Sequence, residues 1–358
     1  MYLKRIKLVN FRNYQQQEIE LSPNMNLFFG ENAQGKTNIL EAVFLCAIGK
    51  SFRAKKEKEL INLEKKQAFV EIEYEKSDRS GKIKIILDDK KTIFLNDIKQ
   101  SKLSDILGKI NMVMFSPDDI EILKSSPAKR RRFLNIMISQ LRPHYVHSLN
   151  MYQKTLEQRN NYLRQIVKEN KPEEMLEIWD ESLANYAKEI YEYRNEFVGK
   201  IKEKISDIHS QITDRQEELK IKYISDCENK ETYKEELIKS RKADIERGYT
   251  SKGIHRDDIY FFINKKQVNI YGSQGQNRTV ILSLKLAELE IIKDETEEYP
   301  ILLLDDFMSE LDGKRRENFL KNIYNTQILI TCTEEFTICE KMCKNFQVKN
   351  GNVENKKE

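Results

Sequence analysis

The sequence predicts an α/β core that is formed by two separated segments of the chain, with a helical lobe inserted between them. Apolar strands and one buried helix occupy the first third, whereas a charged, nearly glycine-free middle has helical periodicity. After Gly253 the composition returns to strands, loops and a long helix. We therefore expect residues 1–115 and 255–358 to form the core, called the head below, and residues 116–254 to form the helical lobe.

The first segment of the head should contain four strands and one helix. Apolar residues alternate or cluster in the strand candidates, and Pro23 and Asn24 mark a turn. The helix candidate has the three- and four-residue apolar spacing of a buried helix. The strands are expected at residues 2–9, 17–29, 68–75 and 82–95, and the helix at residues 37–48.

The helical lobe should be an antiparallel arm of modest length. From Trp179 to Ile208, apolar residues recur at three- and four-residue steps, which predicts a helix with one continuous apolar face. That face can pack on the segment before Pro172, and a further helix is expected at residues 232–246. These helices are too short for a far-reaching coiled-coil rod.

The second segment of the head should alternate strands with one long helix. Apolar runs predict strands at residues 259–263, 301–304 and 327–331, and a helix is expected at residues 276–293. The polar tail after Asn350 is expected to be frayed.

Composition excludes several classes of protein. The chain of 358 residues has no run of 18 uncharged apolar residues and no apolar signal core, so we expect a cytoplasmic protein without a membrane segment. Its five cysteines are scattered and odd in number, which favours buried thiols over disulfides or a metal site. The formal net charge is only +4, so overall charge identifies no partner.

A phosphate-binding loop is predicted between the strand that ends near Phe29 and the helix that follows. Residues 30–37 match G-x-x-x-x-G-K-[ST] completely. Lys36 should reach the β- and γ-phosphates of ATP, and the Thr37 hydroxyl should ligate Mg²⁺. A chance glycine loop is the alternative, and the flanking elements disfavour it. The expected nucleotide-binding residues are Gly30, Glu31, Asn32, Ala33, Gln34, Gly35, Lys36 and Thr37.

Two acids, Asp305 and Asp306, directly follow an all-apolar strand. Carboxylates at the end of a buried strand are costly without a partner, and Mg²⁺ supplies one. We expect Asp305 to hold Mg²⁺ through water and Asp306 to orient or deprotonate the attacking water, with Lys36 as the third catalytic group. A plain polar turn is the alternative, and it fits less well between Pro300 and Phe307.

A second anion site is predicted at the start of the long helix near residue 276. By itself the sequence Ser-Gln-Gly-Gln at 273–276 is explained equally well by a serine cap and a glycine turn. Together with the phosphate loop, Ser273 and Gly275 gain a role as a second phosphate cradle. One subunit cannot normally use both cradles on one nucleotide, so we expect two subunits to share each ATP. The loop Ser-Glu-Leu-Asp at 309–312 should line that interface.

These motifs resemble the ATP-binding-cassette heads of DNA-repair and chromosome-maintenance ATPases, and over nearly its full length the chain resembles the RecF family of bacterial recombination proteins. The resemblance implies an ABC-type head, related to structural-maintenance-of-chromosomes proteins, with a short helical arm. The matching residues are 8–14, 30–37, 51–53, 116–119, 130–134, 255–258, 272–279 and 305–312.

The resemblance implies more than the fold. It implies an ATP-dependent homodimer that binds DNA at single-strand gaps and junctions, hydrolyses ATP slowly under stimulation by DNA, and acts with RecO and RecR to load RecA in repair and replication restart. It also places Arg12 and Asn13 near the nucleotide and Asp118 at a junction of lobes. Two departures from transporter cassettes are Asp306, where glutamate is common, and the absence of histidine at residues 331–333.

DNA contacts are the least defined part of this interpretation. Residues 1–17 carry only basic charges, and we select Lys4, Arg5 and Lys7 as candidate phosphate contacts, although a solvated charged face explains them equally well. Two other functions stay open: the nucleotide-binding subunit of a transporter, which the charged arm disfavours, and a clamp that binds ATP without turnover. DNA binding by backbone contacts should depend steeply on salt.

Overall fold

The computed structural model describes residues 1–306, 325–335 and 343–356, and the chain divides into two compact units. Unit 1 contains residues 1–119 and 285–358, and unit 2 contains residues 120–284. One unit is thus inserted in the sequence of the other. The second boundary falls inside a helix at residue 284, so that residues 255–284, which we expected in the head, are grouped with the helical unit. The first boundary directly follows Asp118 and Asp119.

Unit 1 contains twelve strands in its described part, together with one complete α-helix and the last part of a helix that begins in unit 2. The complete helix, α1, follows β3, as the apolar spacing predicted. The elements are β1 (Tyr2–Phe11), β2 (Tyr14–Glu20), β3 (Met25–Phe29), α1 (Lys36–Ile48), β4 (Ala68–Glu75), β5 (Ser80–Leu87), β6 (Thr92–Leu95), β7 (Ile98–Gln100), β8 (Met112–Phe115), β12 (Ile301–Asp305), β13 (Ile328–Cys332), β14 (Cys343–Lys349) and β15 (Asn352–Lys356).

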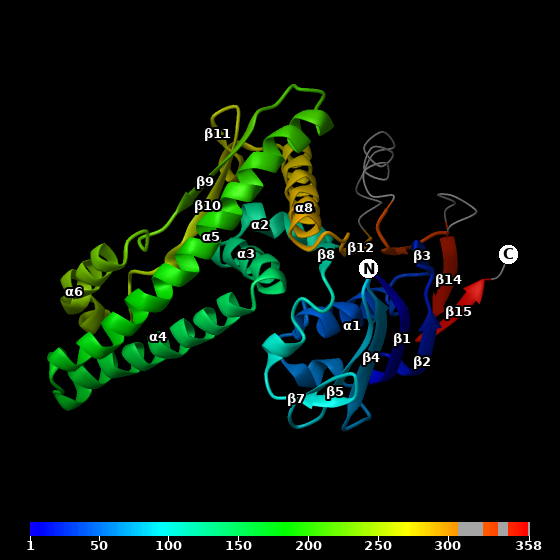
Figure 1. Ribbon diagram of the computed structural model, residues 1–358, viewed down its shortest axis with the longest axis horizontal. Helices are drawn as coiled ribbons and strands as arrows, with labels where there is room; N and C mark the ends of the chain where they lie inside the picture. The colour runs from blue at the N-terminus through cyan, green and yellow to red at the C-terminus, as the bar shows by residue number, and fades with distance from the viewer. Residues whose placement is uncertain (307–324, 336–342, 357–358) are drawn as a thin grey trace. The chain divides into compact units, whose positions relative to one another are not determined.

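Two six-stranded sheets organise unit 1 (Figure 1). The antiparallel sheet has the order β2-β1-β4-β5-β6-β7, and the second sheet has the order β15-β14-β3-β13-β12-β8. All neighbours in the second sheet are parallel except β14 and β15. Helix α1 contacts β4 and β5 of the first sheet and β12 and β13 of the second, which explains why eleven of its thirteen residues are buried.

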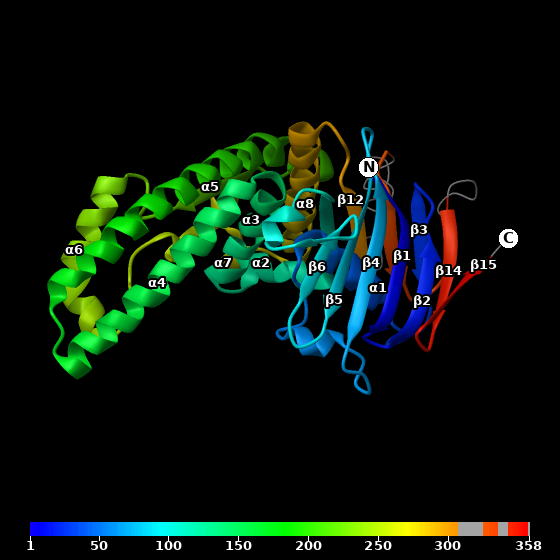
Figure 2. The ribbon, with the colours of Figure 1, turned by 60° about the horizontal axis from the view of Figure 1, so that its bottom comes forward.

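Unit 2 is mainly helical. Helices α4 and α5 are joined by a short turn and lie side by side in both views (Figures 1 and 2), as predicted for an antiparallel arm. A small sheet has the order β11-β10-β9. The elements are α2 (Glu121–Lys124), α3 (Pro127–Leu141), α4 (Pro143–Glu169), α5 (Leu176–Ile212), β9 (Leu219–Ile224), α6 (Lys230–Arg247), β10 (Asp258–Ile263), β11 (Lys266–Gln267) and α7 (Val268–Tyr271), followed by α8 (Gln274–Thr296), which runs across the boundary.

Two local expectations were wrong. The helical middle contains the strand β9, whose partner β10 lies in a different part of the sequence, so helical periodicity around it gave no warning. The tail after Asn350 is not frayed but forms β15, because it pairs with β14 from Asn345↔Lys356 to Lys349↔Asn352. In addition, the strand expected at residues 17–29 is two strands in different sheets, separated at the predicted turn.

Buried ion pairs connect the helices of unit 2. Arg159 has no exposed side-chain surface and donates to Asp180 Oδ1 (2.7 Å) and Asp244 Oδ2 (2.9 Å), which joins α4 to α5 and α6. Arg241 donates to the second oxygen of Asp180 at 2.8 Å. Because leaving any one of these charges unpaired in the interior is costly, this network fixes how the three helices pack. In the described part of the chain, no helix is both long and apolar enough to cross a membrane.

Candidate phosphate-binding site

The phosphate loop connects β3 to α1 and needs glycine at both ends. Gly30 has a φ of 152°, and a Cβ there would lie 2.3 Å from the carbonyl oxygen of Val348 on β14. Gly35 has a φ of 115°, and a Cβ there would lie 2.5 Å from Asn13 Nδ2. The two glycines are therefore required by close approach of neighbouring strands and turns as well as by their backbone conformation.

Lys36 begins α1 and turns back into the loop. Its side chain is nearly buried, and Nζ donates to the carbonyl oxygens of Gly30 (2.7 Å) and Glu31 (2.9 Å). The ammonium is thus held against the loop at the N-terminus of α1, whose first N–H groups have no acceptor within the helix. Such an arrangement suits the phosphates of a nucleotide, and nucleotide binding at Lys36 stays a prediction of the motif.

Two other turns brace the loop from outside. In the turn between β1 and β2, Asn13 Nδ2 donates to the carbonyl oxygen of Gln34 at 2.8 Å and the Tyr14 hydroxyl donates to that of Gly35 at 3.0 Å. In the turn between β14 and β15, the N–H of Asn350 donates to Gln34 Oε1 at 2.6 Å. The C-terminal hairpin, which sequence patterning missed, therefore fixes the shape of the predicted site.

The acidic pair lies at the end of β12, next to the first turn of α1. Thr37 Oγ1 donates to Asp305 Oδ1 at 2.7 Å, and the Thr331 hydroxyl donates to the same oxygen at 2.8 Å. The N–H of Asp306 donates to Thr331 Oγ1 at 3.0 Å. Burial raises the pKa of Asp305, and the hydrogen bonds from Thr37 and Thr331 lower it in part.

The donors at this edge fit a magnesium ion. Hydroxyl and carboxylate oxygens are the hard ligands that Mg²⁺ prefers, and Thr37 and Asp305 present both types within hydrogen-bond distance of each other. Burial of the ionised Asp305 carboxylate without a cation is unfavourable, and a bound metal ion would offset that cost. Among the described residues, no group of three or more His, Cys, Asp or Glu could hold a metal, so water and phosphate oxygens would complete the shell.

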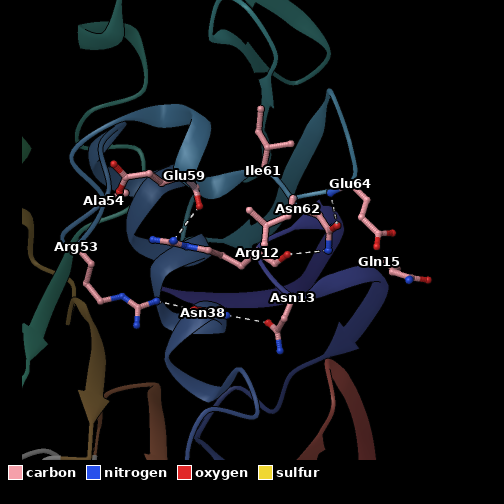
Figure 3. Close-up of a pocket in the computed structure, with 11 residues that line it drawn as sticks. Arg12, Asn13, Gln15, Asn38, Arg53, Ala54, Glu59, Ile61, Asn62 and Glu64 are labelled. Carbon is pink, nitrogen blue, oxygen red and sulfur yellow. Dashed lines mark hydrogen bonds between the residues drawn. The ribbon is translucent and has the colours of Figure 1, made fainter.

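A pocket of about 800 Å³ lies beside the phosphate loop (Figure 3). Arg12 and Asn13 line it, as do Asn38 of α1 and Arg53 from the loop after α1. Asn38 donates to Asn13 Oδ1 at 2.8 Å and accepts from Arg53 Nη2 at 2.5 Å. The pocket thus collects the two residues that the family resemblance placed near a nucleotide, together with two further polar side chains.

Sequence reasoning missed Glu41, the residue on which these arginines converge. Arg12 donates to it through Nε and Nη2, and Arg53 through Nη2. The signal was present in the sequence, because Glu41 is a single acid in an otherwise apolar stretch of a buried helix. A lone charge in such a position requires a partner.

The second predicted anion site lies in unit 2, at the start of α8. The N–H of Gln276 donates to Ser273 Oγ (3.1 Å) and the N–H of Ser273 donates to Gln276 Oε1 (2.9 Å), which is a capping box. Asn277 Nδ2 donates to the carbonyl oxygens of Gly272 (3.0 Å) and Ser273 (2.7 Å). The turn is therefore well fixed, yet Ser273 and Gly275 are exposed. The predicted loop at 309–312 lies outside the described residues.

The candidate DNA contacts lie on β1, between two strands that carry acids. Lys4 forms an ion pair with Glu75, and Arg5 donates to Glu18 (2.6 Å) and to Glu73. Lys7 faces Glu18 and Glu71 in the strand register. These partners partly neutralise the local positive charge that the first 17 residues suggested.

The two sheets, the phosphate loop and the acidic pair define an ATPase head of the RecF, RecN and SMC class. The family model described as "RecF/RecN/SMC N terminal domain" matches residues 2–356. Among solved structures, an SMC head domain from Pyrococcus furiosus superposes with a TM-score of 0.57 at 18% identity, covering 99% of this chain and 96% of that one, which shows a shared fold.

More specific comparisons identify the family. The DNA replication and repair protein RecF of Clostridium perfringens is 44% identical, covering 99% of this chain and all of the relative, and that of Acetivibrio thermocellus is 44% identical over 94% of each chain. A structure of "the recombination mediator protein RecF-ATP in RecFOR pathway" superposes with a TM-score of 0.94 at 38% identity, covering 99% and 98% of the two chains. This chain belongs to the RecF family.

Proposed function

We propose that the chain is an ATP-dependent, DNA-binding recombination mediator that uses the nucleotide as a switch. ATP is held by the phosphate loop, two copies assemble around it, and the assembled dimer binds DNA at single-strand gaps or junctions. Slow hydrolysis, stimulated by DNA, releases the dimer. In this role the protein acts with RecO and RecR to load RecA.

The nucleotide part of the proposal is supported by the site and by a relative. Lys36 lies within the loop, and the relative with 38% identity was solved as a RecF–ATP complex. Mg²⁺ would be held by Thr37 and, through water, by Asp305, where it would neutralise phosphate charge. Asp306, at the exit of β12, would orient the attacking water.

The observation that carries the dimer is the environment of Gly275. This glycine lies in the first turn of α8, and among the described residues a Cβ added to it would meet only Ser273 Oγ, at 3.9 Å. Its φ is not in the left-handed region, so nothing in the described part of the subunit requires glycine. Glycine in a helix costs about 0.5–1 kcal/mol relative to alanine. A group from outside the subunit that approaches the backbone closely would require glycine at this position despite that cost. The exposed N-terminus of α8 is suited to a phosphate as that group.

Exposed apolar side chains next to this glycine support the same interface. Ile270 and Tyr271 on α7 are 64% and 69% exposed, and they directly precede the turn to Ser273. The turn that presents them is fixed by Asn277, so this surface is preorganised. A second copy that places its phosphate loop over Ser273 would bury both side chains.

DNA contacts would come from the backbone-binding cations of β1. Lys4, Arg5 and Lys7 are proposed to exchange their acidic neighbours for DNA phosphates, at a cost because the existing ion pairs must break. Binding of this kind is independent of base sequence and weakens steeply as salt rises.

The test combines sedimentation and duplex binding with and without ATP and Mg²⁺. We expect the wild type to dimerise and to bind gapped DNA only with ATP, Lys36→Ala to lose both through loss of ATP binding, and Ser273→Arg to bind ATP as a monomer. Ser80→Arg is the control, because Ser80 is also exposed, and this variant should dimerise normally. A wild type that stays monomeric with saturating ATP, Mg²⁺ and gapped DNA would refute the proposal, and zero single-turnover hydrolysis by an intact dimer would favour a clamp.

A further inference from the structure

Glu41 joins two arginines from different segments at the rim of the pocket beside the phosphate loop. It lies on α1 just over one turn after Lys36, and its side chain has no exposed surface. Arg12 donates to its two oxygens through Nε (2.9 Å) and Nη2 (2.8 Å), and Arg53 donates through Nη2 (2.8 Å). The hydroxyl of Ser51 donates a further hydrogen bond.

The charges of this cluster favour an anion in the pocket. Burial alone would raise the pKa of Glu41, but the hydrogen bonds from Arg12, Arg53 and Ser51 outweigh it and the pKa is lowered. The carboxylate is therefore ionised, and two guanidinium groups on one carboxylate leave a net charge of +1 on this cluster. Because Glu59 and Glu64 also line the pocket, the anion would bind at the two arginines. A guanidinium has five N–H donors. Arg12 uses three of them and Arg53 two in the bonds to Glu41, Asn38 and Glu59, which leaves donors for a ligand.

A second buried carboxylate in the chain shows what is distinctive about Glu41. Asp180 also has no exposed surface and also binds two arginines, Arg159 and Arg241. Arg159 is completely buried and Arg241 keeps 20% of its side-chain surface, and the cluster connects three helices. The partners of Glu41 keep 22% and 35% of their side-chain surface, and both line the pocket. The difference therefore lies in the surroundings, since the arginines of Glu41 border a ligand-sized space.

We propose that Glu41 is a positioning residue, which fixes the guanidinium groups of Arg12 and Arg53 at the pocket rim so that they bind the phosphates of ATP. This role rests on the proposed binding of ATP by the phosphate loop. Two arginines on separate loops repel each other and have long, mobile side chains. Anchoring both on one carboxylate of the helix that begins at the loop removes that repulsion and orients the fork of each guanidinium before the nucleotide arrives.

The experiment is a double-mutant cycle on the full chain, read as equilibrium binding of a fluorescent ATP analogue with Mg²⁺. We expect Glu41→Gln to weaken binding about tenfold. Added to an Arg12→Ala/Arg53→Ala background, the same change should alter binding by less than about twofold, because its effect passes through the arginines. Wild-type affinity in Glu41→Gln, or an equal tenfold loss in both backgrounds, would overturn the positioning role.

Asp180→Asn is the matched control, since it also removes one buried charge that holds two arginines. It should lower the unfolding temperature and leave ATP affinity within about twofold. If Glu41→Gln does not fold, Arg53→Ala replaces it, because Arg53 is partly exposed, and unchanged ATP affinity in this variant would overturn the proposal. If the wild type binds ATP no better than Lys36→Ala, the proposed function itself is overturned. If the wild type binds ATP much better than Lys36→Ala, and Glu41→Gln binds it as tightly as the wild type, only the role of Glu41 is overturned.

Discussion

The hydroxyl of Thr37 donates a hydrogen bond of 2.7 Å to Asp305, although 268 residues separate them in the sequence. The contact forms because β3 and β12 both lie next to β13 in one parallel sheet, and parallel strands end at the same edge. Thr331 at the end of β13 donates to the same carboxylate oxygen. The ends of β12 and β13 and the first turn of α1 thus meet at Asp305, and the hydroxyl and carboxylate oxygens there suit a magnesium ion.

Replacement of Asp305 should separate nucleotide binding from hydrolysis. Asp305→Asn keeps the shape and the contact with Thr37 but removes the charge that would hold Mg²⁺ through water. We expect ATP affinity within about tenfold of the wild type and single-turnover hydrolysis slower by at least about a hundredfold, measured by quenched flow with radiolabelled ATP. Hydrolysis near the wild-type rate would exclude Asp305 from the metal site.

Asp306→Asn should give a different phenotype from Asp305→Asn. If Asp306 only orients the attacking water, its loss leaves Mg²⁺ and ATP bound. We expect a dimer that persists for hours in ATP by sedimentation, with hydrolysis reduced by at least about a hundredfold. A dimer that still decays at the wild-type rate would assign this role to another residue.

Gly275→Ala should stabilise the monomer while blocking the dimer. A Cβ has open space at this helical position, so the change should raise the free energy of unfolding by about 0.5–1 kcal/mol. The same methyl group would occupy the approach of the partner's phosphate, and ATP-dependent dimerisation should be lost.

Gly199→Ala provides the control for this prediction. Gly199 lies in α5, and a Cβ there has no neighbour within 4 Å in the part of the chain that the structure describes. Its replacement should stabilise the protein by a similar amount, measured by urea unfolding, with dimerisation unchanged. Normal dimerisation of Gly275→Ala would contradict the shared nucleotide site.

Acid should destabilise the protein through His255. Burial lowers the pKa of His255 to about 4, against the small opposing effect of its bond to the carbonyl oxygen of Thr250. Its other ring nitrogen lies 2.7 Å from the Tyr152 hydroxyl. Because the pKa is lower in the folded state than in the unfolded state, stability is complete above about pH 6.5 and is lost as pH falls towards 4. The contribution is on the order of 3 kcal/mol.

The pH dependence is tested by urea unfolding between pH 7 and pH 4. His255→Gln should be less stable at pH 7 but should lose less stability on acidification than the wild type. His144→Gln is the control, since His144 is 62% exposed, and it should retain the full wild-type slope. Parallel wild-type and His255→Gln curves would show that other groups govern acid unfolding.

Much of the fold could be predicted from local patterns. Helix α1 begins at Lys36, one residue before the predicted start. This prediction succeeded because the phosphate-loop motif and the apolar spacing both indicated a helix there. The four consecutive apolar residues before Asp305 likewise predicted the buried strand β12. Strand β9 and the C-terminal strand β15 were missed. Both have mixed polarity and form by pairing with another strand, β10 and β14 respectively. The residues of β9 and β15 alone do not reveal that pairing.

The sequence by itself determined the chemistry available: a phosphate loop with Lys36 and Thr37, and two acids after a buried strand. These are local features, because each depends on residues that are neighbours in the chain. Only the tertiary structure decided that Asn13 and Asn350 brace the loop at Gln34 and that Arg12 and Arg53 share the carboxylate of Glu41. Contacts of this kind depend on strand order and side-chain packing between distant segments, and no periodicity along the chain encodes them.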